Sequence, residues 1–166
     1  RVSTTLEMKE AVDQELAGHA AAGEDPSTAS VDILIAAAAV NDWQPKDMRD
    51  SKVSTRSGSP YHIELEPTPK IIDGVKQISP NTKLIAFRAQ ADMTAEQLRD
   101  DALDRLRKAN ADMIAANDIS ALGAGFETDT NAVTVVHPSG EYRELELNDK
   151  LGIAIGILRE FLEKNG

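Results

Sequence analysis

The chain has 166 residues, a length that fits one domain with a single buried core. It contains no cysteine, which excludes disulfides, thiolate metal sites and a cysteine nucleophile and is compatible with a reducing, intracellular setting. Acidic residues outnumber basic ones by 28 to 18, and this balance argues against a nucleic-acid-binding surface.

The N-terminal part of the chain predicts a helix, a loop and a strand. Thr4 and Glu7 have the spacing of a capping box, and the apolar positions after them follow a helical period, which predicts a helix over residues 5–21. Residues 23–28 predict a loop. The apolar run 31–40 is too short for a membrane span, which takes about 20 residues, and predicts a buried strand covered on both faces of a parallel sheet.

A polar, irregular segment follows this strand. It contains a predicted short strand at residues 52–55 and a predicted turn at 56–60. Apolar and polar side chains then alternate over residues 61–66, which is the period of a half-exposed strand. Together these segments predict a hairpin arm over residues 52–65.

Two helices and a strand are predicted in the middle of the chain. Thr68, followed by a proline, predicts the N-cap of a short helix over residues 71–78. Residues 83–89 predict a strand. Thr94 opens a second capping box, which predicts a longer helix.

The last third of the chain predicts a strand, a hairpin and a helix. Residues 112–116 predict a third buried strand, and residues 132–137 and 142–147 flank a Pro-Ser-Gly turn, which predicts a β-hairpin. Asn148 is expected to cap a final amphipathic helix. Its apolar stripe is expected to consist of Leu151, Ile155, Leu158 and Leu162.

The alternation of strands and helices predicts one α/β domain over residues 1–166, with a Rossmann-like, doubly wound, mainly parallel sheet and an antiparallel hairpin at one edge. In such sheets ligands bind beyond the carboxyl ends of the strands. This rule directs attention to residues 38–43, 87–91 and 116–119.

Four motifs occur in order along the chain. The first is Ala-Ala-Ala-Ala-Val-Asn-Asp-Trp at 36–43 with Lys-Val at 52–53, and the second is Glu-Pro-Thr-Pro-Lys-Ile at 66–71. The third is Ile-Ala-Phe-Arg-Ala at 85–89, and the fourth is Lys-Ala-Asn-Ala-Asp-Met-Ile-Ala-Ala-Asn-Asp at 108–118. Together they resemble the pattern of the phosphopantothenoylcysteine synthetase family over nearly the whole chain.

The resemblance implies a cytoplasmic ligase of coenzyme A synthesis, found alone or fused behind a flavin-dependent decarboxylase. The carboxylate of 4′-phosphopantothenate attacks the α-phosphate of CTP, or of ATP in some lineages, and the amine of cysteine then displaces the nucleotide. Mg²⁺ shares the charge that develops on the phosphates. The resemblance also implies a homodimer that pairs through the arm.

The resemblance further assigns roles to residues of the first motif. The positions that match Ala38, Ala39 and Asp42 contact the nucleobase in relatives, and a carboxylate can accept a hydrogen bond from the exocyclic amine of either cytosine or adenine. Lys52 matches the essential, catalytic lysine, which lies on a mobile loop and reaches the phosphates or the acyl-nucleotide.

The later motifs add further candidates. Phe87 and Asn117 match positions that border the nucleotide. Lys70 is expected to contact a phosphate, and Arg88 is a weaker candidate for the same role.

The chain also departs from the family pattern. An N-terminal strand, a glycine-rich phosphate loop and an Asn-x-Ser-Ser-Gly segment do not occur in it. Because such loops cradle phosphates, we expect an N-terminally truncated part of the synthetase domain that is inactive alone. Ser54 and Thr55 replace a lysine pair of many bacterial members, which leaves CTP and ATP both open.

Two alternatives remain beside the ligase. One is a non-catalytic nucleotide-sensing or scaffolding domain, and the other is a reductase, which would need a Gly-x-Gly-x-x-Gly fingerprint that this sequence lacks. The three histidines have no metal-ligand spacing, so no metal site is predicted. Asp100 and Asp101 are expected on a solvated helix face.

Overall fold

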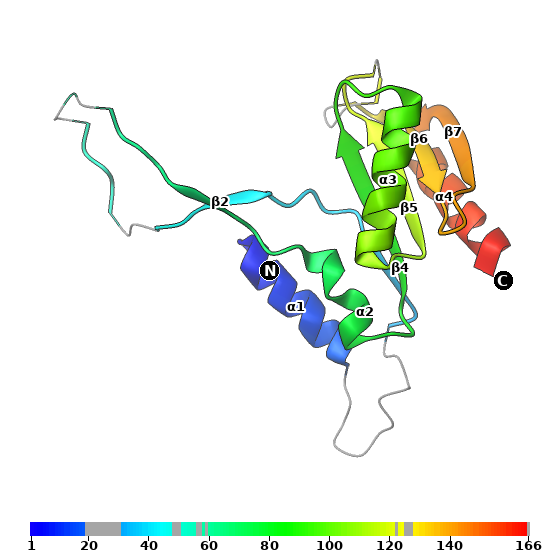
Figure 1. Cartoon of the computed structure of the whole chain (residues 1–166), viewed down its shortest axis with the longest axis horizontal. Helices are drawn as coiled ribbons and strands as arrows, with labels where there is room; N and C mark the ends of the chain where they lie inside the picture. The colour runs from blue at the N-terminus through cyan, green and yellow to red at the C-terminus, as the bar shows by residue number, and fades with distance from the viewer. Residues whose placement is uncertain are drawn as a thin grey trace.

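A five-stranded sheet in the order β1-β4-β5-β6-β7 runs through the body of the molecule (Figure 1). The computed structural model describes residues 1–18, 31–47, 51–55, 58, 60–121, 123–124 and 128–165. The strands are β1 (Ile33–Ala36), β4 (Lys83–Gln90), β5 (Met113–Asp118), β6 (Thr130–Val136) and β7 (Tyr142–Asp149). β1, β4 and β5 are parallel, whereas β6 and β7 form an antiparallel hairpin, so the predicted fold class is confirmed.

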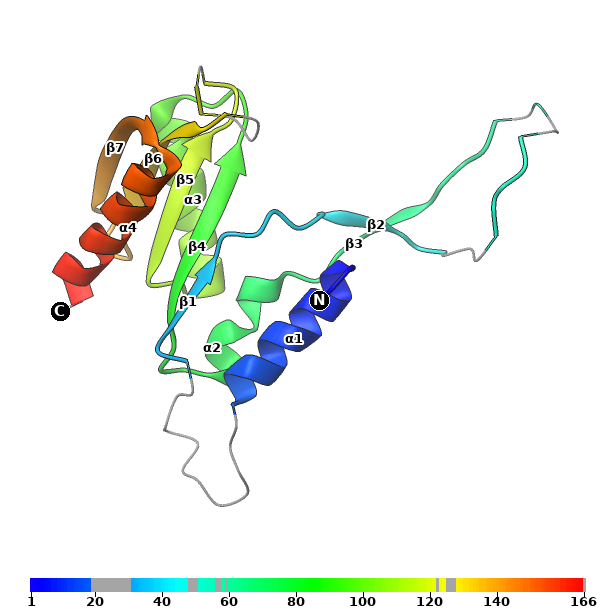
Figure 2. The same ribbon diagram turned by 180° about the vertical axis from the view of Figure 1, so that it is seen from behind.

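The helices lie on both faces of this sheet (Figures 1 and 2). α3 (Ala95–Ala109) covers one face and α4 (Lys150–Asn165) covers the other. α1 (Thr5–Ala17) packs against η1 (Ile71–Asp73) and α2 (Val75–Ile78), and these elements share the apolar core of the α3 face. Within the described ranges, no helix is long and apolar enough to span a bilayer.

Successive side chains of β4 point to opposite faces of the sheet, and the core therefore has two halves. Leu84 and Ala86 point into the core on the α3 face, whereas Ile85 packs with Ile153 and Ile157 of α4. Successive side chains of a strand point to opposite faces, so a central strand must be apolar on both.

Both predicted capping boxes are confirmed. The hydroxyl of Thr4 accepts from the backbone N–H of Glu7 at 3.1 Å, and Thr94 does the same for α3. α1 ends at Ala17, earlier than the predicted residue 21, because Gly18 follows with a φ of 67° that favours glycine. The loop predicted at 23–28 lies outside the described residues.

The apolar run 31–40 forms a shorter and more exposed strand than predicted. Only Ile33–Ala36 pair, and Ile33 and Ile35 are 38% and 46% exposed. β1 is an edge strand that pairs with β4 alone, so the prediction of a strand covered on both faces is wrong for this chain. The residues after it, 37–40, leave the ladder and stay exposed.

The short helix predicted at 71–78 is divided into η1 and α2 at Gly74. Thr68 does not cap it, because its buried hydroxyl donates to the carbonyl of Asn41 instead. This bond, together with the backbone bond from Thr68 N to Asp42 O at 3.0 Å, fixes the end of the arm beside the end of β1.

The predicted apolar stripe of α4 is wrong. Leu151 and Leu162 are 70% and 61% exposed, and Ile155 and Leu158 are exposed as well. The helix instead buries the opposite face. That face consists of Ile153, Ile157, Glu160 and Phe161. Asn148 does not cap it either, because β7 continues to Asp149, whose carboxylate accepts from Gly152 N at 2.6 Å.

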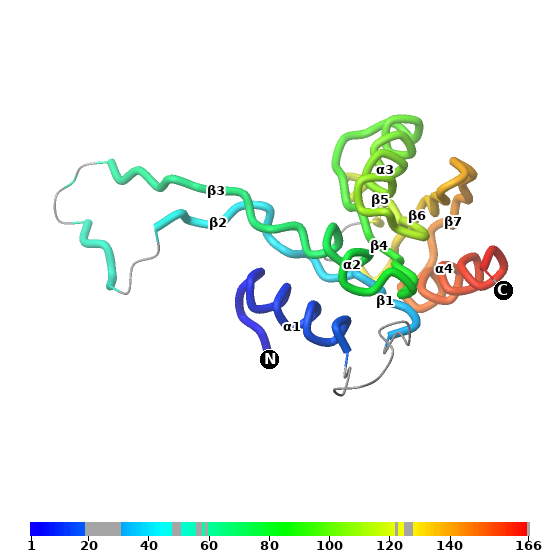
Figure 3. Tube along the Cα trace, turned by 60° about the horizontal axis from the view of Figure 1, so that its bottom comes forward, coloured from blue at the N-terminus to red at the C-terminus, as the bar shows by residue number. Residues whose placement is uncertain are grey.

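The hairpin arm has its ladder at the base, where β2 (Trp43–Pro45) pairs with β3 (Leu65–Pro67). The described residues between them, 46–47, 51–55, 58 and 60–64, project away from the body (Figures 1 and 3). The predicted strand at 52–55 is not formed, and only Leu65 and Glu66 of the predicted strand 61–66 belong to a ladder. A two-stranded ribbon without a third strand is marginally stable in water, which accounts for the short ladder. Most of the predicted turn 56–60 lies outside the described residues.

Candidate functional site

Two cavities open at the carboxyl ends of β1 and β4. The larger, of about 640 Å³, lies on the side of α1 and α3, and we call it the α3-side cavity. The smaller, of about 390 Å³, is walled by α4, and we call it the α4-side cavity. Both cavities are lined by the same wall of Ala37, Ala38, Ala39, Phe87 and Ala89. Small side chains after β1 therefore leave room on both faces of the strand ends.

The α3-side cavity carries four cationic side chains and one carboxylate. The cations are Lys70, Arg88, Arg105 and Lys108, and the carboxylate is Asp42. Apolar side chains of α1 and η1, such as Val12 and Ile72, complete its walls. A concave site with an apolar wall and convergent charges is typical of a small-molecule site.

Asp42 and Lys70 form an ion pair at the mouth of this cavity. The hydrogen bond from Lys70 holds the pKa of the Asp42 carboxyl below its ordinary value, with smaller contributions from the charges of Arg88 and Arg105. Asp42 is therefore ionised at neutral pH. One of its oxygens accepts from Lys70, and no hydrogen bond within the described part of the chain involves the other.

Arg88 is held by a bidentate contact to Asp101 of α3, at 2.7 and 3.2 Å. Gln90 donates to the same carboxylate at 3.0 Å. The hydrogen bond raises the pKa of Arg88 and lowers the pKa of Asp101. The prediction that Asp101 lies on a solvated face is thus wrong, since it orients a cation of the cavity.

Arg105 and Lys108 were not predicted from the sequence. Arg105 pairs with Asp73 of η1, and Lys108 pairs with Asp104 at 2.6 Å. Helical spacing was the available signal, because positions 101, 105 and 108 fall on one face of α3. This helix face can be assigned to the site only when η1 and β4 are known to lie beside it.

The α4-side cavity has amides and one cation. These are Asn117 at the end of β5, Asn131 at the start of β6 and Lys150 at the start of α4. The amide of Asn117 makes two long hydrogen bonds, to the carbonyl of Ala124 at 3.3 Å and to Asn131 Oδ1 at 3.4 Å. The geometry leaves polar groups directed at a largely apolar cavity.

The structure divides the predicted site residues between the two cavities. Ala38, Ala39 and Phe87 line both of them, Asp42 and Lys70 line the α3-side cavity, and Asn117 lines only the α4-side cavity. Lys52 lines neither of these cavities and is exposed on the projecting arm.

Among the described residues, no group of three or more His, Cys, Asp or Glu side chains is placed to hold a metal ion. Mg²⁺ bound to a nucleotide needs few protein ligands, because phosphates and water supply most of its coordination.

The fold and the site belong to the class of doubly wound α/β domains, in which ligand cavities lie beyond the carboxyl ends of parallel strands. Residues 1–164 match the model of the DNA/pantothenate metabolism flavoprotein C-terminal domain, and the chain belongs to this family. The predicted resemblance is confirmed.

Several curated relatives carry the name coenzyme A biosynthesis bifunctional protein CoaBC, and two of them illustrate the similarity. The chain is 37% identical over 123 residues to that of Thermococcus kodakarensis and 36% identical over 129 residues to that of Bacillus subtilis. The alignments cover 74% and 78% of this chain but only 28% and 30% of those proteins. The chain thus spans less than a third of the length of these two relatives.

A solved structure gives the same assignment. The crystal structure of the C-terminal domain of a CoaBC protein matches with a TM-score of 0.66 at 33% identity, covering 99% of this chain and 67% of that chain. The fold and the order of motifs therefore agree with one family.

Proposed function

We propose that this chain is part of a ligase that joins 4′-phosphopantothenate to cysteine through an acyl-nucleotide formed from CTP or ATP. The observation that carries the proposal is the α3-side cavity, where Asp42 and cations of β4 and α3 meet at the ends of parallel strands. The coenzyme A biosynthesis names of the relatives support the same reaction. Their bifunctional naming supports a partnership with a flavin-dependent decarboxylase, and we place the reaction in the cytoplasm.

The nucleotide is proposed to occupy the α3-side cavity. Ala38, Ala39 and Phe87 would pack against the base, and the unpaired oxygen of Asp42 would accept from its exocyclic amine. Lys70 and the guanidinium groups would bind the phosphates, since guanidinium presents two parallel donors to an anion. Mg²⁺ would accompany the phosphates and spread the charge that develops there.

Attack of the substrate carboxylate on the α-phosphate forms the acyl-nucleotide and releases pyrophosphate. The amine of cysteine then attacks the acyl carbon and displaces the nucleotide. The chain's own part is to hold both substrates and to place fixed cations where charge develops. Lys52 is proposed to contribute its ammonium from the arm, and the exposed apolar side chains of the arm are proposed to pair two copies into a homodimer.

Isothermal titration of the full-length natural polypeptide with CTP and with ATP, each with Mg²⁺, tests the proposal. We expect one of them to bind, and Asp42→Asn to weaken that binding by about 10-fold or more, as for loss of a hydrogen bond to a charged group. Asp32→Asn is a matched control, because Asp32 precedes the same strand at its other end. Failure of both nucleotides to bind the wild type contradicts the proposal.

A further inference from the structure

The four cations of the α3-side cavity differ in how firmly they are held. Within the described part of the chain, Lys70, Arg105 and Lys108 each make one ion pair, and the carboxylate that pairs with Lys108 is itself exposed. Arg88 is instead held at two of its nitrogens, because Nε and Nη2 donate to the two carboxylate oxygens of Asp101. Arg88 is therefore the cation of this cavity whose orientation is best fixed before a ligand binds.

Gln90 holds Asp101 in turn. Its side-chain amide donates to Asp101 Oδ2 at 3.0 Å, and the same oxygen accepts from Arg88 Nε at 2.7 Å. Gln90 and Arg88 are two positions apart on β4 and so point to the same face of the sheet, where α3 places Asp101. An amide suits this position because it can donate to a carboxylate, whereas a second carboxylate would repel Asp101.

This arrangement leaves one edge of the guanidinium free. A guanidinium has five N–H donors and Asp101 accepts from two of them, so three remain on Nη1 and Nη2. Arg88 lines the α3-side cavity, whereas Asp101 and Gln90 are not among its lining residues. The two partners thus hold Arg88 from outside the cavity, and its free edge is available to a ligand within it.

Building on the proposed function, we propose that Asp101 and Gln90 are positioning residues of the nucleotide site, which hold Arg88 so that its free N–H groups meet the phosphates of the nucleotide. A long side chain that is already fixed loses less conformational freedom when a ligand binds. The planar guanidinium then presents parallel donors that match two phosphate oxygens. Asp101 and Gln90 do not touch the nucleotide and act through Arg88.

The charge of Asp101 gives this role a sign that can be tested. A carboxylate near a phosphate site repels the ligand, so by charge alone Asp101→Asn would strengthen nucleotide binding. If the carboxylate positions Arg88, the same substitution releases the guanidinium and weakens binding, although a negative charge has been removed. The two effects thus predict opposite directions for one variant.

Isothermal titration of the full-length natural polypeptide with CTP and with ATP, each with Mg²⁺, measures these effects. For the nucleotide that binds, we expect Arg88→Met to weaken binding about 10-fold or more and Asp101→Asn to weaken it about 3- to 10-fold. Asp101→Glu, which keeps the carboxylate, should lose less than Asp101→Asn. Gln90→Met, which changes no charge, should weaken binding about three-fold. Asp100→Asn is the matched control, because Asp100 is the exposed neighbour of Asp101 on α3, and should stay within about two-fold.

A double-mutant cycle separates positioning from a structural role. If Asp101 acts through Arg88, Asp101→Asn should change the affinity by less than about two-fold in the Arg88→Met background, since no guanidinium is left to position. In assays of pyrophosphate release, Asp101→Asn should raise KM for the nucleotide and leave KM for cysteine within about two-fold. A general loss of folding would not give this split.

The outcomes separate this inference from the proposed function. Tighter or unchanged nucleotide binding by Asp101→Asn overturns the positioning role, as does an equal loss in the wild-type and Arg88→Met backgrounds. If Asp101→Asn does not fold, Gln90→Met decides, and an unchanged affinity of that variant overturns the inference. Wild-type affinity of Arg88→Met places the phosphates elsewhere and leaves the ligase standing, whereas failure of the wild type to bind either nucleotide contradicts the ligase itself.

Discussion

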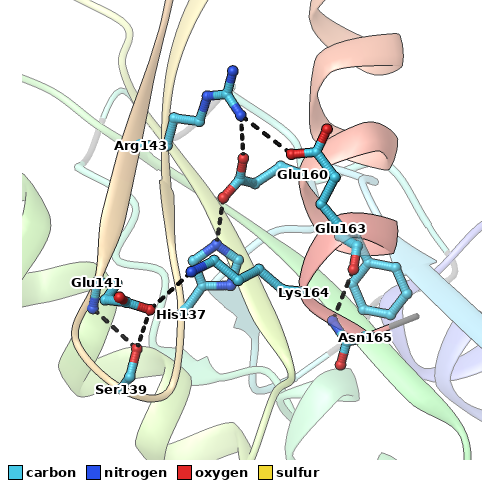
Figure 4. A network of polar contacts seen from close by, with 9 residues as sticks. His137, Ser139, Glu141, Arg143, Glu160, Glu163, Lys164 and Asn165 are labelled. Carbon is cyan, nitrogen blue, oxygen red and sulfur yellow. Dashed lines mark hydrogen bonds and ion pairs between the residues drawn. The ribbon is translucent and has the colours of Figure 1, made fainter.

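Glu160 is the most buried carboxylate of the described residues, and its two oxygens join α4 to the β6–β7 hairpin (Figure 4). One oxygen lies 3.0 Å from His137 Nε2 and the other accepts from Arg143 at 2.7 Å. Burial raises the pKa of Glu160, but the hydrogen bonds from Arg143 and His137 outweigh it and hold the pKa below its ordinary value. The buried charge is thus stabilised by its partners.

Replacing this carboxylate should make stability less dependent on pH. Because the folded pKa of Glu160 lies below the unfolded value of about 4.3, its contribution is present above that value and is lost as pH falls through the folded pKa. At neutral pH we expect Glu160→Gln to lower the free energy of unfolding by about 1–3 kcal/mol, measured by urea denaturation.

The difference between Glu160→Gln and the wild type should then shrink as the pH falls from about 5 to about 3. Glu163→Gln is the control, because Glu163 is exposed and lies 3.6 Å from the same arginine, so its effect should stay below about 0.5 kcal/mol at every pH. A difference for Glu160→Gln that is independent of pH would contradict this account.

Single residues of the site could be predicted from the sequence only where they belong to a recognisable motif. Asp42 follows a strand and Phe87 lies within one, each inside a recognisable segment, and both line a cavity. Lys150 could not be identified in this way, because an isolated lysine after a polar strand is indistinguishable from a surface charge until the sheet places it beside Asn131. The sequence also could not predict that Asn117 and Asp42 line different cavities, since the order of the strands does not reveal on which face of the sheet each side chain lies.

At the scale of elements, hydrophobic periodicity predicts the buried face of α3 but not the buried face of α4. α3 has one apolar stripe, in which Leu98, Ala102 and Leu106 are buried and Leu103 is partly buried. α4 has apolar residues on two faces, so periodicity alone could not choose between them. The sheet determines which face of α4 is buried, because the face with Ile157 packs against Ile85, Met113 and Val135.

The two faces of α4 should therefore respond differently to truncation. Ile157→Ala removes a buried side chain from the α4 half of the core and should lower the free energy of unfolding by about 2–4 kcal/mol. Leu158→Ala, one position along and 40% exposed, should cost less than about 1 kcal/mol. Urea denaturation of both variants measures the difference, and equal losses would show that the assignment of faces is wrong.

At the scale of the whole molecule, the arm is the feature that the rest of the fold does not explain. It leaves the body beside the end of β1, and Ile63 and Leu65 on it are 62% and 51% exposed. Exposed apolar side chains on a two-stranded ribbon favour contact with another chain. Lys52 lies on the same arm and lines neither cavity of its own body, so in a dimer we expect it to act at the partner's cavity.

Mixed dimers test this arrangement. Lys52→Met and Asp42→Asn should each inactivate the full-length enzyme, the first through the arm and the second through the cavity. If the arm acts on the partner, a dimer with one copy of each variant has one site with both residues intact. Random pairing of equal amounts then restores about a quarter of the wild-type turnover, measured as pyrophosphate release from co-expressed, separately tagged chains.

If Lys52 instead folds back onto its own body, every site in that mixture lacks either Lys52 or Asp42, and no turnover returns. Mixing each variant with itself gives the background, and Ile63→Asp, which places a charge on the apolar surface of the arm, should abolish the restored turnover by preventing pairing. Recovery that survives Ile63→Asp would mean that the copies pair through another surface. The projection of the arm away from the body and the absence of Lys52 from the lining of the α3-side cavity both favour exchange between two copies.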